Sequence, residues 1–312
     1  MANILITGGA GYIGSILTPL LLEDGHKVTV VDNYKYNQTS LADLIINPNF
    51  NLIIRDCREI DFIKSIINKF DFIVPLAAYV GAPLCNKDPW GASTINKSSI
   101  FDLLKITSNS QYVIMPTTNS AYGTGDKDNY CDENSQLNPI SLYAKEKVEV
   151  EDILMQRENS VSFRLATVFG MSPRMRLDLL VNNFTFRALF ERTIVLFESH
   201  FNRNYIHVRD VANLFKFTIN NIENFNNEIF NFGLSDANLS KMELCLKIKN
   251  FIPDLEIYDS SSGKDPDQRN YLVSNKKIES RGIKPSISLD EGIEELVKGL
   301  QIFNTYHLHS NV

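Results

Sequence analysis

The sequence predicts an α/β fold in which helices doubly wind a parallel sheet, with a smaller C-terminal lobe beside it. Over the first half of the 312-residue chain, short apolar runs alternate with segments whose apolar residues recur at helical spacing. A glycine-rich turn directly follows the first apolar run. After about residue 168 the alternation loosens, which predicts a separate lobe set over the carboxyl ends of the strands.

The elements are expected in the following order. Asn3–Thr7 predicts a buried strand, and Tyr12–Glu23 predicts a helix that the Asp24-Gly25 turn would end. Further strands are expected at the short apolar runs 27–31, 52–55, 72–76, 111–115 and 161–165. Helices are expected at 59–70, 89–105 and 141–157, and loops at 171–176, at the Asn182-Asn183 pair and at 260–268.

The bulk composition narrows the classes of partner. A net charge of −6 argues against nucleic acid or an anionic membrane as the main partner. The four cysteines lie far apart without a CxxC pair, so neither a zinc site, another metal centre nor a disulfide framework is expected. Free thiols without a recognisable signal segment predict a cytoplasmic location, and no apolar run approaches the roughly 18 residues of a membrane span.

The segment TGGAGYIG, residues 7–14, predicts a dinucleotide site. It lies between the first strand and the first helix and contains Gly9-x-Gly11-x-x-Gly14, a spacing that lets the backbone approach a pyrophosphate at the helix N-terminus. Asp32 ends the second strand, where a carboxylate accepts hydrogen bonds from ribose hydroxyls and repels a 2′-phosphate. NAD is therefore favoured over NADP. A glycine-rich turn with a solvated aspartate is the alternative, and a P-loop is excluded because Ser15 stands where lysine is required.

This Rossmann-type NAD-binding domain is expected to span 1–167, with 204–232 returning to it. The substrate-binding lobe would then consist of 168–203 and 233–312.

Tyr143 and Lys147 lie four residues apart in a predicted helix, so their side chains share one face. A phenol that acts as a base near neutral pH needs its pKa lowered by about 3 units, or about 4 kcal/mol. A lysine cation about 4 Å away supplies an energy of this order at an effective dielectric of 20. YxxxK alone is a common surface pattern, but in its own helix, far downstream of a dinucleotide fingerprint, it favours a catalytic pair.

Together these segments resemble the extended short-chain dehydrogenase/reductase family, the nucleotide-sugar epimerases and dehydratases. The resemblance covers nearly the whole chain. It rests on TGGAGYIG (7–14), Asp32, Arg55-Asp56-Cys57, VPLAA (74–78), Asn96, PTTNSAYG (116–123), YAKEK (143–147), RLATVFG (164–170) and RNYIHVRD (203–210).

The resemblance implies roles for individual residues. Thr118 would hydrogen-bond the hydroxyl being oxidised, Tyr143 would take its proton, and Lys147 would lower the phenol pKa and bind the nicotinamide ribose. The implied cofactor-binding residues are Gly8, Gly11, Tyr12, Ile13, Gly14, Asp32, Asn33, Asp56, Cys57, Leu76, Ala77, Ala78, Asn96, Tyr143 and Lys147. The implied substrate-binding residues are Val80, Gly81, Cys85, Asn119, Ser120, Arg174, Arg176, Asn182, Arg203 and Arg269.

Within the substrate set, Arg203 would hold the sugar nucleotide's diphosphate, for which a bidentate guanidinium is well suited. Cys85 either touches substrate or simply fills space. Arg174 and Arg176 either reach phosphates or are solvated loop residues.

Departures from the family pattern restrict the chemistry. Family dehydratases follow the catalytic threonine with Asp-Glu, whereas this chain has Asn119-Ser120, which disfavours elimination of water. The late Arg-Pro-Gly-Asp motif is replaced by residues 265–268, Asp-Pro-Asp-Gln, so Arg269 is the residue expected to substitute there. The segments VGAPLC (80–85), SPRMR (172–176) and HFNRNYIHVRDV (200–211) resemble a branch of surface-polysaccharide pathways that includes GDP-mannoheptose 4-dehydrogenases of capsule synthesis.

The resemblance thus implies an NAD-dependent enzyme that oxidises the C4 hydroxyl of a nucleotide-diphosphate sugar. A 4-dehydrogenase of the GDP-heptose type would release the 4-keto sugar, whereas a 4-epimerase would return the hydride to its other face. The rival from a different class is a non-catalytic NAD-binding module, against which the complete Thr118, Tyr143 and Lys147 set argues. A homodimer is implied, formed through the helices that hold Asn96 and Tyr143.

Overall fold

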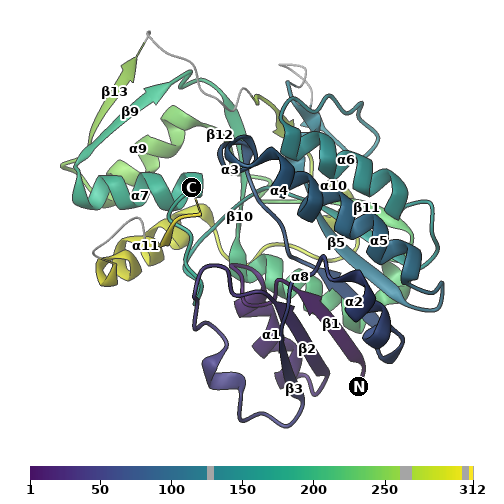
Figure 1. Cartoon of the computed structure of the whole chain (residues 1–312). Coiled ribbons are helices and arrows are strands. Elements are labelled where there is room, and N and C mark those ends of the chain that lie inside the picture. The colour runs from purple at the N-terminus through teal and green to yellow at the C-terminus, as the bar shows by residue number, and fades with distance from the viewer. Residues whose placement is uncertain (125–129, 261–268, 304–308, 312) are drawn as a thin grey trace.

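The computed structural model describes residues 1–124, 130–260, 269–303 and 309–311. Its centre is a seven-stranded sheet in which every pairing is parallel, in the order β11-β7-β5-β4-β1-β2-β3 (Figure 1). The strands are β1 (Asn3–Thr7), β2 (Lys27–Asp32), β3 (Phe50–Ile54), β4 (Phe72–Pro75), β5 (Tyr112–Thr118), β7 (Ser160–Leu165) and β11 (Glu228–Phe232). The predicted fold class is confirmed.

Helices cover both faces of this sheet because its strands are apolar on both sides. In β1, Ile4 and Ile6 pack into one cluster with α1 (Gly14–Glu23) and α8 (Val208–Asn220). Leu5 points to the opposite face and joins a cluster with α2 (Ile60–Ile66), α5 (Ser99–Ile106) and α6 (Leu142–Leu154). Residues 208–232 therefore return to the first lobe through α8 and β11.

The predicted long helix at 89–105 is a continuous helical segment made of three pieces. These are α4 (Pro89–Ser93), a π-helical turn at Thr94–Ser98 and α5. The wider turn carries Asn96, whose side chain contacts the loop after β4, as described below.

Within the described residues, the second lobe is built from small sheets and three helices. β8 (Thr167–Phe169), β10 (Asn202–His207) and β12 (Asn238–Ser240) form a three-stranded sheet. Two-stranded sheets pair β9 (Thr193–Phe197) with β13 (Glu256–Ser260) and β6 (Tyr130–Cys131) with β14 (Leu272–Val273). These helices are α7 (Leu180–Phe190), α9 (Lys241–Phe251) and α11 (Leu289–Gly299), whereas α3 (Ala82–Lys87) and α10 (Lys276–Ser280), which packs against β11, belong to the first lobe.

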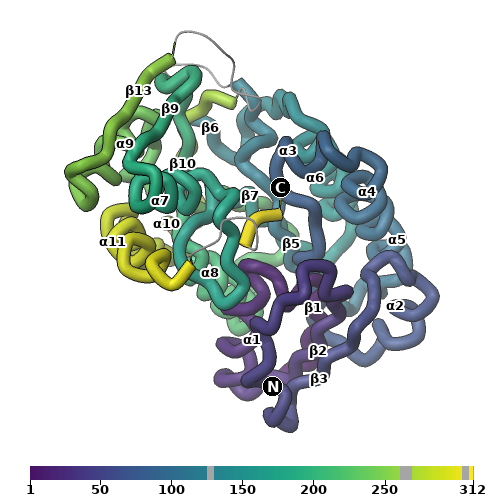
Figure 2. Tube along the Cα trace, turned by 60° about the vertical axis from the view of Figure 1, so that its left-hand side comes forward, coloured from purple at the N-terminus to yellow at the C-terminus, as the bar shows by residue number. Residues whose placement is uncertain are grey.

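Short 3₁₀ turns connect these elements at Ala42–Leu44, Ile67–Lys69, Asn119–Tyr122, Ile222–Asn224 and Leu300–Ile302. Figure 2 shows that the last described residues lie between the two lobes, where His309 O accepts a hydrogen bond of 2.8 Å from Leu177 N. Within the described ranges, each helix is too short or too polar to cross a bilayer.

The prediction of a loop at the Asn182-Asn183 pair is wrong, because both residues lie inside α7. Asparagine often ends helices because its amide competes for backbone groups. Here the Asn182 amide is fully buried and bonded outside its own helix, to Gly170 N (2.9 Å) and Arg176 O (2.9 Å), so that competition is removed. The loop at 171–176 is present, and of the one expected at 260–268 only Ser260, the end of β13, lies within the described residues.

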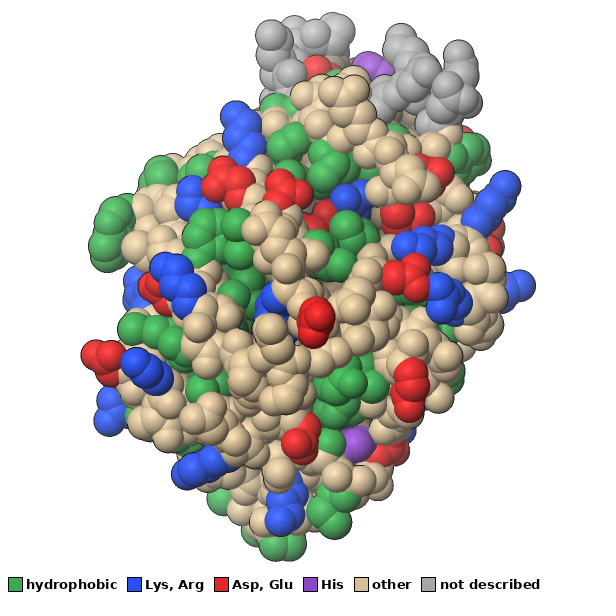
Figure 3. Space-filling view, turned by 90° about the vertical axis from the view of Figure 1, so that its right-hand side faces the viewer, with side chains coloured by type: hydrophobic (Ala, Val, Ile, Leu, Met, Phe, Trp, Pro, Cys, Tyr) green, Lys and Arg blue, Asp and Glu red, His purple; other side chains and the backbone are tan. Residues whose placement is uncertain are grey.

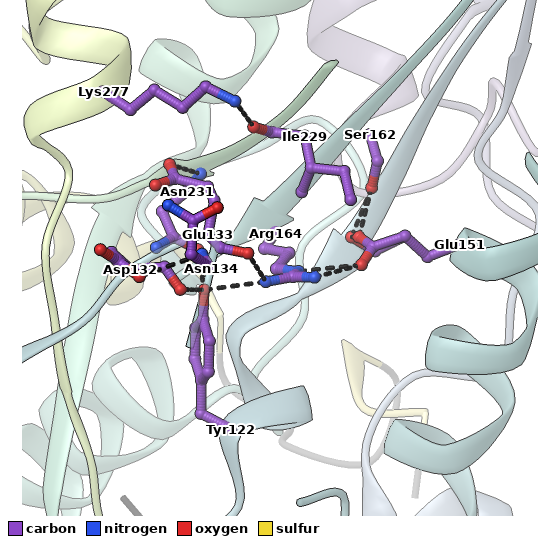
Figure 4. A network of polar contacts seen from close by, with 11 residues as sticks. Tyr122, Asp132, Glu133, Asn134, Glu151, Ser162, Arg164, Ile229, Asn231 and Lys277 are labelled. Carbon is purple, nitrogen blue, oxygen red and sulfur yellow. Dashed lines mark hydrogen bonds and ion pairs between the residues drawn. The ribbon is translucent and has the colours of Figure 1, made fainter. Parts of the chain in front are cut away.

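A buried ion pair joins β7 to α6 beneath the carboxyl ends of the strands (Figure 4). The Arg164 and Glu151 side chains are 5% and 3% exposed. Arg164 donates to Glu151 Oε1 from Nε at 2.9 Å and from a terminal nitrogen at 2.6 Å. It also donates to the Tyr122 hydroxyl at 3.1 Å. Burial opposes the charge of Arg164, but Glu151 and Tyr122 together more than offset it and hold the guanidinium pKa above its ordinary value.

The other Glu151 oxygen extends this network into the sheet. It accepts hydrogen bonds from Thr117 at 2.8 Å and from Ser162 at 2.6 Å. Tyr122 in turn donates to Asn231 at 2.7 Å, which brings in β11. The network therefore sets α6 against the end of β5.

Replacing one partner of this pair tests its importance. We expect Arg164→Met to lower the free energy of unfolding by roughly 3–5 kcal/mol, because it leaves the Glu151 carboxylate buried without its cation. Urea unfolding measures the loss. Arg187→Met, which removes an exposed i,i+4 pair with Glu191, is the control and should cost at most about 0.5 kcal/mol. A loss below about 1 kcal/mol for Arg164→Met would contradict this account.

Candidate active site

A cavity of about 460 Å³ lies at the carboxyl ends of the parallel strands. It is lined by the glycine-rich turn, by the ends of β2, β4 and β5, by the start of α6, and by residues of the second lobe. This is the place where an open parallel sheet binds ligands, because loops from neighbouring strands converge there.

The glycine-rich turn leaves room for a ligand at the start of α1. Gly8 has a φ of +73°, and a Cβ there would lie 2.5 Å from Ala77 N, so a larger residue is excluded. A Cβ on Gly11 would meet only Gly8 O, at 3.1 Å, and would otherwise enter the cavity that Gly11 lines. The helix has neither a side-chain cap nor an acidic residue in its first turn. A helix N-terminus beside such a cradle fits the pyrophosphate of a dinucleotide.

Asp32 is held at the end of β2 by three donors. Its carboxylate accepts hydrogen bonds from Ala10 N (3.0 Å), Tyr34 N (2.9 Å) and Gln38 Nε2 (3.3 Å). Burial nonetheless raises its pKa above the usual range. The carboxylate thus orients the glycine-rich turn and the following loop as well as lining the cavity.

Asn33, Asp56 and Cys57 lie next to this carboxylate and also line the cavity. Asn33 Nδ2 donates to Asp56 Oδ2 at 3.0 Å. Burial raises the pKa of the Cys57 thiol to about 12, so this cysteine is a neutral, weakly polar wall and not a reactive thiolate.

Thr118, Tyr143 and Lys147 line the same cavity. Thr118 ends β5; its hydroxyl accepts from Ser120 N (3.1 Å) and donates to Ser120 Oγ (2.9 Å). Tyr143 lies in the first turn of α6, which Ser141 caps by accepting a hydrogen bond from Ala144 N at 3.2 Å. Lys147 follows one turn later and donates to Pro116 O at 3.4 Å.

Burial dominates the ionisation of this pair. It raises the pKa of Tyr143 well above the ordinary phenol value, although Arg176 and Arg269 pull in the other direction. It lowers the pKa of Lys147 to about 8. The protein by itself therefore does not produce the low phenol pKa that the Tyr143–Lys147 spacing predicts. Both charges lose solvation in the same enclosed site, and the lysine alone does not compensate the phenolate.

A group of cations lines the cavity from the second lobe. Arg203 is 2% exposed, and its guanidinium lies 5.9 Å from the centre of the Tyr271 ring. Lys241, in the first turn of α9, and Arg269 complete this group, and Arg269 contacts the Ser120 hydroxyl. Three cations lining the same cavity suit a diphosphate ligand.

Four residues expected at the site do not line the cavity. Asn96 is fully buried. Its Oδ1 accepts a hydrogen bond from Tyr79 N and its Nδ2 donates to Tyr79 O, both at 2.9 Å. Cys85 is also fully buried and contacts Tyr79 O at 3.3 Å. Both residues thus support the loop that carries Tyr79, which does line the cavity. Asn182 is buried in α7, and Asn183, the next residue, reaches the cavity instead.

Asn119 is the fourth of these residues. Its side chain is buried, and its amide nitrogen and oxygen have no hydrogen-bond partner in the described part of the chain. The remaining expected residues line the cavity: Gly14, Tyr12, Ile13, Leu76, Ala77, Ala78, Val80, Gly81, Ser120, Arg174 and Arg176, with those described above. The 265–268 motif falls outside the described residues.

The structure adds lining residues that the sequence interpretation missed. They are Lys35, Tyr36, Gln38, Tyr79, Pro83, Asp178, Leu179, Leu180, Asn183, Lys241, Tyr271 and Asn311, among others. Only Lys241 had a usable signal. Ser240 and Glu243 form a capping box, which marks a helix start and therefore places Lys241 in a first turn.

Comparisons with known proteins agree with this arrangement. A family model described as "NAD dependent epimerase/dehydratase family" matches residues 4–233. A Methanocaldococcus jannaschii protein, provisionally named UDP-glucose 4-epimerase, is 26% identical over 96% of this chain and 98% of its own length. UDP-glucuronic acid decarboxylase 1 of Arabidopsis thaliana is 27% identical over 95% of this chain and 69% of its own length.

Solved structures give the same result for the fold. The UDP-glucose 4-epimerase of Thermotoga maritima, solved with UDP-glucose, aligns with a TM-score of 0.83 and 25% identity over 96% of this chain and 99% of its own. The dTDP-glucose 4,6-dehydratase of Bacillus anthracis, solved with NAD, aligns with a TM-score of 0.83 and 19% identity over 97% of both chains.

The buried Asp32 carboxylate predicts cofactor selectivity. We expect NAD to bind at least about tenfold more tightly than NADP, because a 2′-phosphate would lie beside this carboxylate. Competitive binding of the two cofactors measures the ratio, and Asp32→Asn should narrow it. Equal affinities for the wild-type protein would remove the argument.

Proposed function

Since the chain belongs to the NAD dependent epimerase/dehydratase family, we propose that it oxidises the C4 hydroxyl of a nucleotide-linked sugar. The expectations of an NAD-dependent enzyme and of this family are thereby confirmed. The observation that carries the proposal is the convergence of Thr118, Tyr143 and Lys147 on the cavity that also contains the glycine-rich turn and Asp32.

The chain's own residues perform the proton chemistry. When bound, NAD supplies the hydride acceptor and a positive charge beside the phenol. As the C4–H bond breaks and its electron pair leaves with the hydride, the proton of the C4 hydroxyl passes to the Tyr143 oxygen. Thr118 positions that hydroxyl: its own proton is directed to Ser120 Oγ in this structure, and with substrate bound it would donate to the C4 oxygen, whose single proton goes to Tyr143.

Lys147 acts through charge and position. Its Nζ donates a hydrogen bond to Pro116 O, near the end of β5. Because Lys147 is buried, its ammonium interacts more strongly with neighbouring charges than it would in water. A pKa of about 8 leaves it mostly protonated at neutral pH. The cation and the bound cofactor together, and not the cation alone, would stabilise the phenolate.

The residues after Thr118 argue against elimination of water. Asn119 and Ser120 cannot act as a carboxylic acid and a carboxylate base, and the Asn119 side chain does not line the cavity. We therefore favour oxidation at C4 without dehydration.

Two outcomes of this oxidation are proposed. A 4-dehydrogenase releases the keto sugar and accumulates NADH, whereas a 4-epimerase returns the hydride and accumulates none. The relatives named as UDP-glucose 4-epimerases favour the second outcome. The motifs 80–85 and 172–176 favour the first, with a GDP-heptose substrate and a role in capsule synthesis, and these finer assignments stay predictions.

We also propose a homodimer formed through α5 and α6. Figure 3 looks onto the side of the molecule where these helices lie and shows hydrophobic side chains interspersed with charged ones. Trp90 in α4 and Ile153 in α6 are 74% and 39% exposed. Sedimentation velocity at micromolar concentration should show a dimer, and Ile153→Asp should shift it toward monomer. A monomeric wild-type protein would count against the proposal.

A panel of GDP-, UDP-, CDP- and dTDP-sugars is first screened for turnover, with products identified by mass and NADH by its absorbance. The catalytic assignment is then tested with the sugar nucleotide that reacts. We expect Tyr143→Phe to slow hydride transfer by roughly 10²–10⁴-fold while folding and NAD binding survive, because only the proton acceptor is removed. Tyr258→Phe, at an exposed tyrosine, is the matched control and should keep the wild-type rate.

Lys147→Met should slow the reaction similarly and also weaken NAD binding, with Lys145→Met, an exposed neighbour on the same helix, as its control. The two residues act as a unit, so the double variant should cost much less than the product of the single effects. A near-wild-type single-turnover rate in Tyr143→Phe would refute the assignment.

A further inference from the structure

The loop of residues 170–176, which belongs to the second lobe, is fastened onto the glycine-rich turn. The Tyr12 hydroxyl donates to Gly170 O at 2.5 Å, and Ser172 Oγ donates to Tyr12 O at 2.8 Å. Ser172 Oγ also lies 3.0 Å from Ser15 Oγ, in the first turn of α1. The loop therefore sits on the part of the molecule that is shaped for a pyrophosphate.

Arg174 extends from this loop toward the residues that follow β2. Its guanidinium lies 4.7 Å from the centre of the Tyr36 ring, four residues beyond Asp32. One terminal nitrogen donates to Asn311 Oδ1 at 2.7 Å, and the other donates to Met175 O. The residue is 7% exposed and lines the cavity. It is thus a held, buried cation at the adenosine side of the site.

The charges around Arg174 leave it available to an anionic ligand. Its neighbour Arg176 is committed to a buried ion pair with Asp178, whereas Arg174 has no ion-pair partner among the described residues. An arginine has five N–H donors, and the bonds to Asn311 and Met175 O use two of them. Bidentate donation to phosphate oxygens is the interaction for which such a fork is best suited.

Other cations mark the proposed sugar-nucleotide site, which is distinct from the position of Arg174. Arg203 lies by Tyr271, Arg269 contacts the Ser120 hydroxyl, and Lys241, whose ammonium donates to Phe197 O, also lines the cavity. None of the contacts described for Arg174 involves these residues. Arg174 on one side and these three cations on the other correspond to two diphosphates, one in the cofactor and one in the substrate.

We propose that Arg174 binds the diphosphate of the dinucleotide cofactor, so that the second lobe contributes directly to holding NAD. This rests on the proposed NAD-dependent function and reassigns Arg174 from the substrate to the cofactor. The loop that carries Arg174 is bonded to Tyr12 through Gly170 and Ser172. Cofactor binding to Arg174 would therefore stabilise the contact between the lobes, and that contact would in turn stabilise the bound cofactor.

Ligand fragments separate this assignment from its alternatives. Titration calorimetry is performed with ADP-ribose, AMP, 2′,5′-ADP, UDP and GDP on the wild type, Arg174→Met, Arg174→Lys, Arg203→Met and the surface control Arg187→Met. We expect Arg174→Met to weaken ADP-ribose binding by about 10- to 100-fold, with at most about a threefold effect on AMP and on UDP or GDP. Arg174→Lys, which keeps the charge but loses the fork, should fall between Arg174→Met and the wild type.

Arg203→Met should show the opposite pattern, with weaker binding of UDP or GDP and unchanged ADP-ribose. Arg187→Met should resemble the wild type throughout. Unchanged ADP-ribose affinity in a variant that keeps the wild-type melting temperature would overturn the proposal. So would a loss confined to UDP or GDP, or one confined to 2′,5′-ADP, which would place Arg174 on the substrate or on a ribose phosphate.

Failure of the wider function has a different signature. If neither UDP nor GDP binds to the wild type, the nucleotide-sugar assignment is in error, while the ADP-ribose measurements still decide the role of Arg174. If Arg174→Met does not fold, Arg174→Lys carries the test, and wild-type ADP-ribose affinity in that variant would count against a bidentate contact.

Discussion

The buried pair of Arg164 and Glu151 is the interaction on which the arrangement of Thr118, Tyr143 and Lys147 depends. Glu151 lies on the helix that carries Tyr143 and Lys147, and Arg164 lies on the strand beside the one that ends at Thr118. The second carboxylate oxygen is bonded to Thr117 and Ser162. A buried charge tolerates little displacement from its partner, because any loss of contact leaves it unsolvated. The pair therefore limits how far α6 moves along the end of β5.

The same enclosure that orders these groups works against their ionisation. Burial raises the pKa of Tyr143 and lowers that of Lys147, so the protein alone favours a neutral phenol. In the proposed mechanism, Tyr143 would become an effective base only with the positively charged cofactor bound, so proton abstraction would be coupled to the presence of the hydride acceptor.

The second lobe contributes two sets of residues to the cavity at the carboxyl ends of the sheet. Its loop at 170–176 is bonded to Tyr12 and Ser15, and brings Arg174 over the Tyr36 ring. Its strand β10 and helix α9 bring Arg203 and Lys241 to the same cavity. Tyr12 illustrates the arrangement: it was expected only as a cofactor contact, but its hydroxyl is used to join the lobes through Gly170 and Asn182.

The sequence by itself determined the parallel sheet, the dinucleotide cradle and the shared face of Tyr143 and Lys147. The cradle and the shared face follow from spacing within a few residues, which reports on the local backbone, and the sheet follows from the alternation of such local patterns over the first half of the chain. Tertiary structure alone decided that Asn182 is a buried support, that Tyr271 lines the cavity, and that Arg174 lies over Tyr36. These outcomes depend on which elements meet after folding. A buried polar side chain bonds to groups on the elements that pack against it, because burying it without a hydrogen-bond partner costs more free energy than local secondary-structure propensity supplies.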